Sequence, residues 1–285
     1  MILGKMKKAD ARRKKEDLIR LLRDTGSLLV AFSGGVDSSF LLAAAHETLG
    51  KKVVAATAVS DIYPLRERDA AVEFTRSRGI PHILFPSDQI SLASFRANRA
   101  DRCYHCKRYL SEKLIGAAEK KGINRVADGA NFDDLKDYRP GIQAAREMGI
   151  ISPLIDLALR KQEIRFLSRE MGLPQWNKPA AACLASRIPY GSPITSEKLK
   201  MINEAEEFLL GKGLTQCRVR HHGSVARIEV ARAELQKVME DNLREAILRK
   251  FKEIGFFHIA VDMEGYISGS MNRGLNIDGL VKTPN

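Results

Sequence analysis

Apolar and polar positions in the first part of the chain alternate between two patterns. Short, continuous apolar runs rich in β-branched residues are typical of strands that are buried on both faces. Each run is followed by a longer segment in which apolar residues recur every three to four positions, as in helices. The runs that predict strands span residues 27–32, 52–59, 80–85, 125–127 and 150–154. The segments that predict helices span residues 9–23, 37–49, 66–78, 104–121, 139–148 and 161–171.

This alternation indicates an α/β domain. Parallel strands need crossover connections, and the crossover helices cover both faces of the sheet. We therefore predict a parallel-sheet domain over residues 1–172, interrupted before Cys103 by a polar, arginine-rich loop.

The alternation stops at residues 173–193. This stretch contains four prolines, which break regular structure, and it predicts a loop between two domains. A helix and three strands are predicted beyond it, at residues 196–210, 216–221, 226–230 and 256–262, with two helical stretches before the last strand. We predict a small α+β domain over residues 194–285.

Length and charge narrow the class of protein. The 285 residues are enough for one large or two modest domains, each with a buried core. No apolar run is long enough to cross a membrane, and the basic N-terminus lacks the apolar part of a signal peptide, so we expect a cytoplasmic protein. The net charge of +12 suits a polyanionic ligand. Residues 5–15 hold part of this charge, in a pattern typical of a solvated helix face.

A glycine- and serine-rich motif joins the first predicted strand to the second predicted helix, as Ser33-Gly34-Gly35-Val36-Asp37-Ser38-Ser39. Its glycines allow a tight turn and a close approach of the backbone to a ligand. The free N–H groups and partial positive charge of a helix start favour an anion. The simpler interpretation is a turn in which Asp37 caps the helix.

The motif, preceded by Ala31, resembles the SGGxDS signature of the PP-loop ATP-pyrophosphatases, which split ATP into AMP and pyrophosphate. No lysine follows the glycines, so it differs from the loop of γ-phosphate-cleaving ATPases. The resemblance implies an adenine nucleotide alpha-hydrolase-like fold. It also implies that the loop holds the pyrophosphate and that Asp37 assists through Mg²⁺.

Two further segments follow predicted strands. Ligands of open parallel sheets bind at the carboxyl ends of the strands. The backbone after the second strand, beginning at Thr57, could read the adenine edge. Asp128 and Gly129 follow the fourth strand, near the expected sugar and α-phosphate.

Cysteines offer a second kind of chemistry. In the cytoplasm they should stay reduced and serve in metal binding or catalysis. Cys103 and Cys106 form a C-x-x-C pair, and Cys183 lies far along the chain. Three thiolates fit a 4Fe–4S cluster with one open iron, whereas a four-thiolate zinc site would need two close pairs. A structural or redox pair is the alternative. We expect Cys217, on a predicted strand, to be a buried small hydrophobe.

Motifs along nearly the whole chain give a more specific resemblance. They are residues 31–39, 101–107, 128–131 with 137–141, 183–187, 218–220 with 226–229, and 265–271. In this order they resemble the LarE family of sulfur transferases, which makes the nickel-pincer nucleotide cofactor of lactate racemase. The family adenylylates a carboxylate of pyridinium-3,5-biscarboxylic acid mononucleotide with ATP. Sulfur then replaces AMP and leaves a thiocarboxylate.

Two sulfur sources are implied by this family. In one type, the cysteine that matches Cys183 gives up its own sulfur and becomes dehydroalanine. In the other, three cysteines hold a 4Fe–4S cluster whose open iron carries the transferable sulfide. Because Cys103 and Cys106 accompany Cys183, the sequence resembles the cluster type, which needs a sulfide donor. The family also implies a homo-oligomer.

The second predicted domain carries the substrate residues implied by the resemblance. Arg218 and Arg220 alternate along one strand and so share a face, where planar guanidinium groups suit phosphate. By resemblance they hold the phosphate of the mononucleotide, with Ser186 and Arg187 nearby. Glu229 is a candidate ligand for metal or substrate. No role is assigned to the neighbouring His221 and His222, nor to His105 inside the C-x-x-C pair.

Three other functions remain compatible with parts of the sequence. A tRNA-thiolating PP-loop enzyme would explain the cysteines and the charge, but no added RNA-binding module or outer cysteine pairs are present. An amide-forming synthetase that uses ammonia leaves the three cysteines unexplained. A non-catalytic nucleotide-binding or zinc-stabilised module would not release pyrophosphate from ATP.

Overall fold

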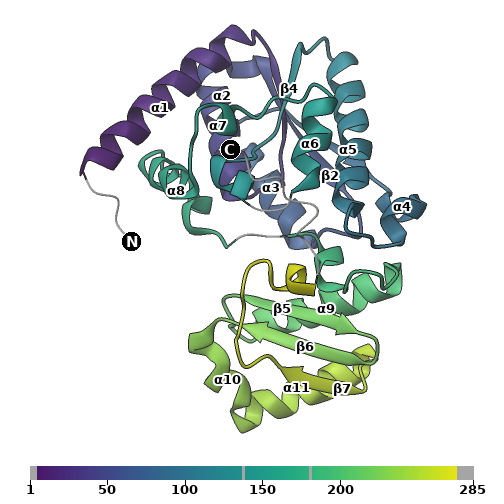
Figure 1. Ribbon diagram of the computed structural model, residues 1–285. Helices are drawn as coiled ribbons and strands as arrows, with labels where there is room; N and C mark the ends of the chain where they lie inside the picture. Colours follow the sequence, from purple (N-terminus) through teal and green to yellow (C-terminus); the bar gives the residue numbers. More distant parts are fainter. Residues whose placement is uncertain (1–4, 137–138, 180–181, 275–285) are drawn as a thin grey trace. The chain divides into compact units, whose positions relative to one another are not determined.

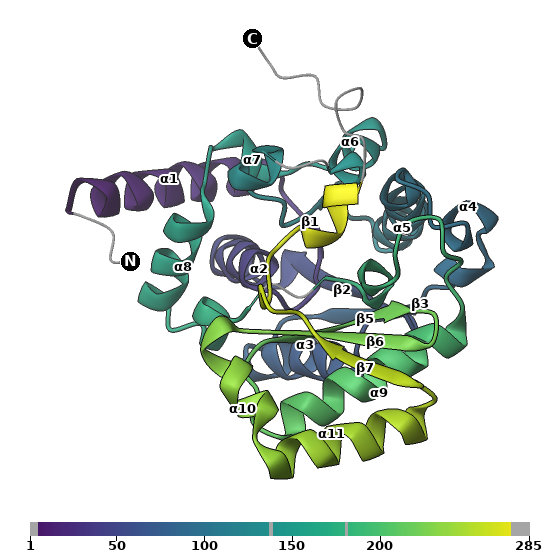
Figure 2. The ribbon, with the colours of Figure 1, turned by 60° about the horizontal axis from the view of Figure 1, so that its bottom comes forward.

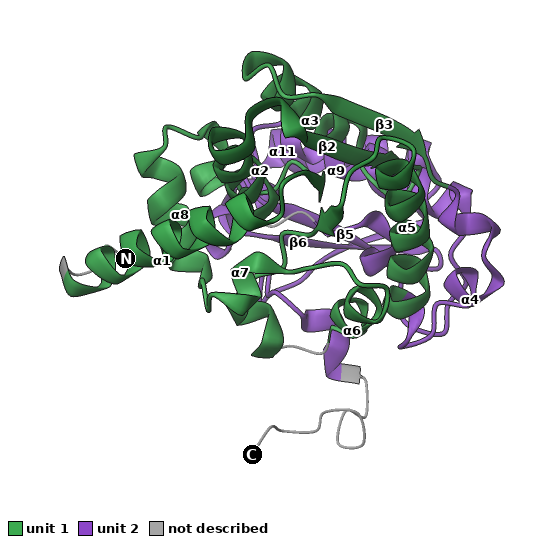
Figure 3. Ribbon diagram, turned by 90° about the horizontal axis from the view of Figure 1, so that it is seen from above, with its two compact units in different colours: residues 1–87, 103–181 green, residues 88–102, 182–285 purple. Residues whose placement is uncertain are grey.

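The computed structural model describes residues 5–136, 139–179 and 182–274. They form two compact units, coloured separately in Figure 3. The first unit comprises residues 1–87 and 103–181, and the second comprises residues 88–102 and 182–285. The arginine-rich segment before Cys103 therefore belongs to the second unit. The domain boundaries at residues 172 and 193 stay a prediction.

A four-stranded parallel sheet forms the centre of the first unit, with strand order β3-β2-β1-β4 (Figure 1). Its strands are β1 (Leu28–Ala31), β2 (Val53–Val59), β3 (His82–Pro86) and β4 (Arg125–Ala127). Leu28 pairs with Val53 on one side and with Arg125 on the other, so β1 is an inner strand. This arrangement brings the carboxyl ends of β1, β2 and β4 to one edge of the sheet.

Helices cover both faces of this sheet. The helices of the first unit are α1 (Lys5–Asp24), α2 (Val36–Leu49), α3 (Leu65–Ser77), α5 (Arg102–Glu119), α6 (Pro140–Glu147), α7 (Pro153–Asp156) and α8 (Lys161–Glu170). Leu28 and Val30 of β1 pack into a core with α1, α2 and α8. Leu29 points the other way, into a second core with α5 and α6. The predicted α/β fold with a parallel, doubly covered sheet is confirmed.

One predicted strand is wrong. Residues 150–154 contribute only an isolated bridge from Ile151 to Ala127, and the chain then enters α7 at Pro153. Proline lacks a backbone N–H and has a fixed φ, so it suits the first turn of a helix and cannot donate to a sheet. The apolar pattern here reflects burial of Leu154 and Ile155 in that helical turn.

The second unit is built on a three-stranded mixed sheet with strand order β5-β6-β7. Strand β5 (Cys217–His222) is antiparallel to β6 (Val225–Val230), which is parallel to β7 (His258–Val261). Its helices are α4 (Ala93–Arg96), α9 (Ser196–Gly211), α10 (Leu235–Met239) and α11 (Asp241–Ile254). Figure 2 shows α9 and α11 along one face of the sheet. This is the α+β unit that the sequence pattern predicts.

The two faces of the small sheet differ in chemistry. The face under α9 and α11 carries the apolar core, which includes Val219, Ile228 and Phe251. Cys217 is part of this core and is 2% exposed, which confirms it as a buried small hydrophobe. Because side chains alternate along a strand, Arg218 and Arg220 lie on the opposite face.

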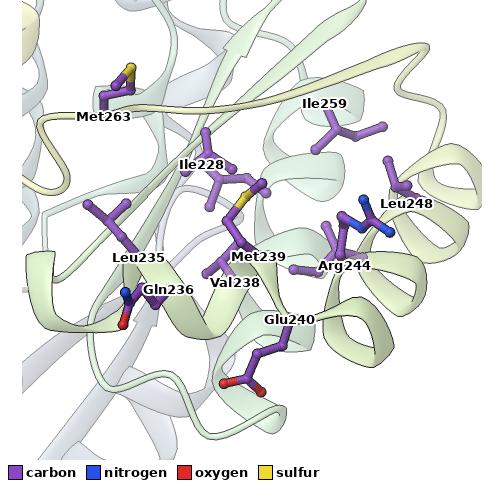
Figure 4. Close-up of a pocket in the computed structure, with 12 residues that line it drawn as sticks. Ile228, Leu235, Gln236, Val238, Met239, Glu240, Arg244, Leu248, Ile259 and Met263 are labelled. Carbon is purple, nitrogen blue, oxygen red and sulfur yellow. The ribbon is translucent and has the colours of Figure 1, made fainter.

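An open apolar cavity of about 800 Å³ lies between this sheet and the helices α10 and α11 (Figure 4). Ile228, Met239, Leu248 and Ile259 are among its lining residues. Ile228 is on the core face of β6, so the cavity opens on the side of the sheet away from the arginines. Within the described ranges, none of the helices is both long and apolar enough to cross a bilayer.

Candidate functional site

The glycine-serine loop between β1 and α2 has the geometry of an anion cradle. Gly34 has a φ of +70°, and a β-carbon on it would lie 3.3 Å from the carbonyl oxygen of Glu67. The hydroxyls of Ser33 and Ser38 are 3.1 Å apart across the turn. Helix α2 begins directly after Gly35, and no side chain caps its N-terminus. Its first N–H groups are therefore available to an anion.

Asp37 is not the helix cap of the simpler interpretation. It lies in the first turn of α2, and its Oδ2 accepts a 2.6 Å hydrogen bond from Lys161 at the start of α8. Its Oδ1 is buried and has no hydrogen-bond partner in the part of the chain that the structure describes. Burial raises the pKa of Asp37, and the ammonium group of Lys161 only partly opposes this effect. A buried carboxylate oxygen without a partner is suited to a hard cation such as Mg²⁺.

Lys178 holds the same loop from another side. Its ammonium group donates to the carbonyl oxygen of Gly34 at 3.1 Å and to Glu67 at 2.7 Å. Its own backbone carbonyl accepts a hydrogen bond from Arg165, which lies one turn after Lys161 on α8. Helix α8 therefore contacts the loop directly through Lys161, and Arg165 of the same helix holds the segment that carries Lys178. Sequence reasoning missed both lysines, because neither belongs to the glycine-serine motif.

The segment after β4 packs directly against this loop. A β-carbon on Gly129 would lie 2.8 Å from the backbone nitrogen of Ser38, so only glycine fits there. Asp128 is buried and accepts hydrogen bonds from Lys107 at 2.7 Å and from Ser152 at 2.8 Å. Burial alone would raise the pKa of Asp128, but Lys107 and these hydrogen bonds outweigh it and lower the pKa. Asp128 is therefore an anion at neutral pH.

Thr57 lies within β2 (Val53–Val59) rather than in a segment that follows the strand, as the sequence analysis placed it. Its hydroxyl donates to the carbonyl oxygen of Phe32 at 2.7 Å and contacts His82 at 2.8 Å. The side chain is therefore engaged within the protein, next to the start of the loop. Only the backbone of this segment is left for the predicted recognition of adenine.

Cys103 and Cys106 lie in the first turn of α5, one helical turn apart, and Lys107 follows them directly. Lys107 connects the pair to Asp128 and so to the loop of the first unit. All four cysteines are thiols, with Cys103 exposed and Cys106 and Cys183 partly buried. Among the described residues, no three histidine, cysteine or acidic side chains gather into a metal site. Asp137 and Tyr138 of the family motif lie outside the described residues.

In the second unit, Cys183 begins a short turn that Arg187 holds in place. Arg187 is 1% exposed and makes two hydrogen bonds to Glu206, of 2.8 and 2.9 Å. It also donates to the carbonyl oxygen of Cys183 at 3.0 Å and to the hydroxyl of Ser186 at 2.9 Å. Burial would raise the pKa of Glu206, but the guanidinium of Arg187 lowers it overall. Arg187 is thus engaged within the protein.

The turn also covers the free edge of β5. Glu206 accepts a hydrogen bond from the backbone N–H of Val219 at 3.1 Å, and Ser186 accepts one from Arg220 at 3.0 Å. The first contact satisfies a backbone N–H group that the edge strand would otherwise expose. In the second, the guanidinium of Arg220 donates to the backbone carbonyl of Ser186 and so ties the turn to β5. They bring four of the predicted substrate residues, Ser186, Arg187, Arg218 and Arg220, into one region of the second unit.

Glu229, a candidate ligand, is fully buried and already engaged. Its two oxygens accept hydrogen bonds from Arg220 at 2.6 Å and from Arg227 at 3.1 Å. The sequence analysis included Arg227 in the motif at residues 226–229 but gave it no role, because only Glu229 was singled out on that strand. The antiparallel register of β5 and β6 could have supplied the signal, since it places Arg227 opposite Arg220.

The fold and the loop of the first unit together define an ATP-pyrophosphatase of the PP-loop type. The chain is 42% identical over 262 residues to an uncharacterized protein of Synechocystis sp., covering 92% of this chain and 98% of that protein. It is 34% identical over 260 residues to the pyridinium-3,5-bisthiocarboxylic acid mononucleotide synthase of Lactiplantibacillus plantarum, covering 91% and 94%. The chain belongs to the family of this synthase, the LarE-like sulfurtransferases.

A more distant relative supports the wider class. One component of the glutamine-hydrolyzing GMP synthase of Methanocella arvoryzae is 27% identical over 211 residues, which cover 66% of this chain and 65% of that component. No protein-family model matches the chain. Membership of the PP-loop class implies that the enzyme uses ATP.

Proposed function

We propose that this enzyme inserts sulfur into pyridinium-3,5-biscarboxylic acid mononucleotide at the expense of ATP. The product would be a thiocarboxylate on the route to a nickel-pincer cofactor, as the resemblance to the L. plantarum synthase suggests. One observation carries the proposal: the same chain holds an anion cradle at the start of α2 and a buried arginine face on β5 and β6. Such a pair suits one nucleotide as reagent and a second, phosphorylated molecule as substrate.

The first step is adenylylation. A carboxylate oxygen of the substrate attacks the α-phosphorus of ATP, the bond from that phosphorus to the β-phosphate oxygen breaks, and pyrophosphate leaves. Backbone N–H groups at the start of α2 and the hydroxyls of Ser33 and Ser38 stabilise the charge on the departing pyrophosphate. Gly129 allows the segment that carries Asp128 to approach this point.

Magnesium fits the residues around the loop. The buried Oδ1 of Asp37 would supply a hard oxygen ligand, and a bound ion would neutralise phosphate charge. In this state Lys161 could move from Asp37 to a phosphate oxygen, which keeps both groups paired. The family resemblance and the buried carboxylate both support this assignment.

The second step replaces AMP with sulfur. A sulfur nucleophile attacks the carbonyl carbon of the acyl-adenylate, and AMP departs with the electron pair of the broken C–O bond. We propose that Cys103, Cys106 and Cys183 ligate a 4Fe–4S cluster, which when bound would supply the sulfide. The C-x-x-C spacing at the start of α5 supports two of these ligands. The sulfur donor that reloads it is a further expected partner.

Anaerobic purification followed by turnover with ATP and the mononucleotide tests this proposal. We expect pyrophosphate, AMP and a thiocarboxylate product, with iron and sulfide bound to the protein and its mass unchanged. Cys103→Ala, Cys106→Ala and Cys183→Ala should each lose iron, whereas Cys217→Ala, in the core, should retain it.

Other outcomes would redirect the mechanism. A loss of the mass of hydrogen sulfide from Cys183 after one turnover, without bound iron, would establish the sacrificial route instead. ATP cleavage that depends on tRNA, with affinity that falls steeply as salt rises, would make the enzyme a tRNA thiolase. Absence of substrate-dependent pyrophosphate release would reject the proposal.

A further inference from the structure

The face of the small sheet opposite α9 and α11 is unusually rich in arginine. Alternation along β5 and β6 places Arg218, Arg220, Arg227 and Glu229 on this face. Arg218 and Arg220 are 7% and 5% exposed, and Glu229 is fully buried. Long charged side chains are rarely buried so completely without a reason.

Arg220 and Arg227 are direct cross-strand partners in the antiparallel register of β5 and β6. Two like charges in such positions repel one another. Glu229 compensates for this repulsion by accepting from Arg220 with one carboxylate oxygen and from Arg227 with the other, at 2.6 and 3.1 Å. Ser270 also donates to Glu229, at 3.3 Å. The carboxylate therefore holds two guanidinium groups side by side.

Neither arginine is fully satisfied by these contacts. The Nε–H group of Arg220 and the Nε–H group of Arg227 are both buried, and neither has a hydrogen-bond partner within the described residues. A buried donor of a charged group that lacks an acceptor is unfavourable, because it has lost its hydrogen bonds to water without replacing them. Such groups are uncommon in native proteins, and a bound water, ion or ligand can supply the missing acceptor.

The charges on this face favour an anion. Three arginines, Arg218, Arg220 and Arg227, are set against two carboxylates, Glu229 and Asp262, which contacts Arg227 at 3.4 Å. One positive charge remains. Burial, together with repulsion from the nearby Arg187, lowers the pKa of Arg218. The two carboxylates therefore do not balance the three arginines on this face.

We propose that Arg220 and Arg227 together bind one oxyanion of the substrate through their Nε–H groups, and that Glu229 is the positioning residue for both. This adds Arg227 to the site and assigns Glu229 to the arginines rather than to a metal or the substrate. A phosphate monoester, with a charge of about −1.5 to −2, matches two guanidinium groups better than a single carboxylate does. The identity of the phosphate as that of the mononucleotide rests on the proposed function.

Binding without turnover tests this inference. Ribose 5-phosphate and pyridine-3,5-dicarboxylate are titrated separately by calorimetry, with the loop of the first unit saturated by a non-hydrolysable ATP analogue. We expect Arg227→Gln to weaken ribose 5-phosphate binding at least tenfold and to leave the dicarboxylate little affected. Arg227→Lys, which keeps the charge but lacks the Nε–H group, should weaken the phosphate as well. Arg244→Gln, on α11 beside the apolar cavity, is the matched control and should change neither.

Glu229→Gln tests the positioning role. It keeps the shape of the side chain but removes the charge. The affinity for ribose 5-phosphate should therefore fall and the KM for the mononucleotide should rise, while the KM for ATP stays constant. Circular dichroism and the thermal midpoint identify variants that fail to fold. If Glu229→Gln or Arg227→Gln fails to fold, the test rests on Arg227→Lys, which keeps the charge. Unchanged phosphate affinity in both Arg227 variants would overturn the inference.

The outcomes separate this inference from the proposed function. If the wild type forms no thiocarboxylate but Arg227→Gln loses phosphate binding, the sulfur chemistry is rejected and the anion site is still supported. If Arg227→Gln inserts sulfur normally with an unchanged KM for the mononucleotide, the sulfur chemistry is supported and the anion site is rejected. A wild-type enzyme that binds the dicarboxylate at this face and not ribose 5-phosphate would refute the assignment to phosphate.

Discussion

Gly129 lies so close to Ser38 that a β-carbon on it would be 2.8 Å from the backbone nitrogen of the serine. The distance is shorter than any ordinary contact between these atoms, so Gly129→Ala must displace either the start of α2 or the segment after β4. We expect a loss of stability of about 1–3 kcal/mol, the usual cost of overpacking. Pyrophosphate release should fall at least tenfold, because the displaced N–H groups are those that face the anion.

Gly116→Ala is the matched control for this prediction. Gly116 lies within α5, and a β-carbon on it would meet nothing within 4 Å. Alanine is favoured over glycine in a helix by about 1 kcal/mol, so this variant should be as stable as the wild type or more so. Urea denaturation and a pyrophosphate assay measure both effects. Equal activity of the two variants would show that the close approach has no role in catalysis.

Lys161 should control the ionisation of Asp37. Burial raises the pKa of Asp37, and Lys161 opposes the rise, so Lys161→Met should raise this pKa further. The acid limb of the profile of pyrophosphate release against pH should therefore move to higher pH. Lys250→Met, on the exposed side of α11, should leave the profile unchanged. An acid limb in the same place in both variants would mean that Asp37 does not need its charge.

His82 should make the first unit sensitive to acid. Burial lowers the pKa of His82 below its ordinary 6.5, so the unfolded chain takes up the proton more readily than the folded chain. The contribution of His82 to the free energy of unfolding is therefore fully present above pH 6.5 and is lost as pH falls through the lower pKa of the folded state. Urea midpoints at several pH values between 8 and 5 measure this loss. His82→Gln should flatten the dependence, and an equal slope in both proteins would contradict it.

Much of the first unit could be predicted from periodicity and the glycine-serine motif. Four strand assignments are confirmed because an apolar run flanked by helical segments has few other solutions in a parallel sheet. The strand at residues 150–154 was wrong because burial produces the same apolar pattern in a helical turn, and Pro153 should have weighed against it. Periodicity cannot distinguish the two when the run is short.

The candidate site was predictable where one motif contains the chemistry and hidden where distant residues supply it. Lys161 and Lys178 reach the loop from another element, and Arg227 lies on the strand opposite Arg220. Side-chain reach and strand register decide these contacts, and neither is visible in local spacing. The arginine-rich segment before Cys103 was similarly expected to be only a loop, but it contains α4 and the buried Asn98.

Asn98 should be essential for the stability of the second unit. It has a φ of +52°, is fully buried, and donates through its amide to the carbonyl oxygens of Ile188, Pro189 and Ser192. Asn98→Gly keeps the backbone conformation without strain but removes these bonds and the buried one that the Oδ1 of Asn98 accepts from Arg102, at a cost of about 1–3 kcal/mol. Urea denaturation checks this value, with the exposed Asn124→Ala as control. A cost of a few tenths of a kcal/mol would show that water replaces the amide.

The partners of Asn98 also determine when its segment can fold during synthesis. The hydrogen bonds from Asn98 reach residues 90 to 94 positions later in the chain. While the ribosome is still making those residues, the segment at 88–102 has no acceptors for its buried amide and cannot settle. Strands β1 to β3 precede it and can begin to form earlier. Residues 88–102 therefore stay unfolded in the nascent chain until residues 188–192 have been synthesised.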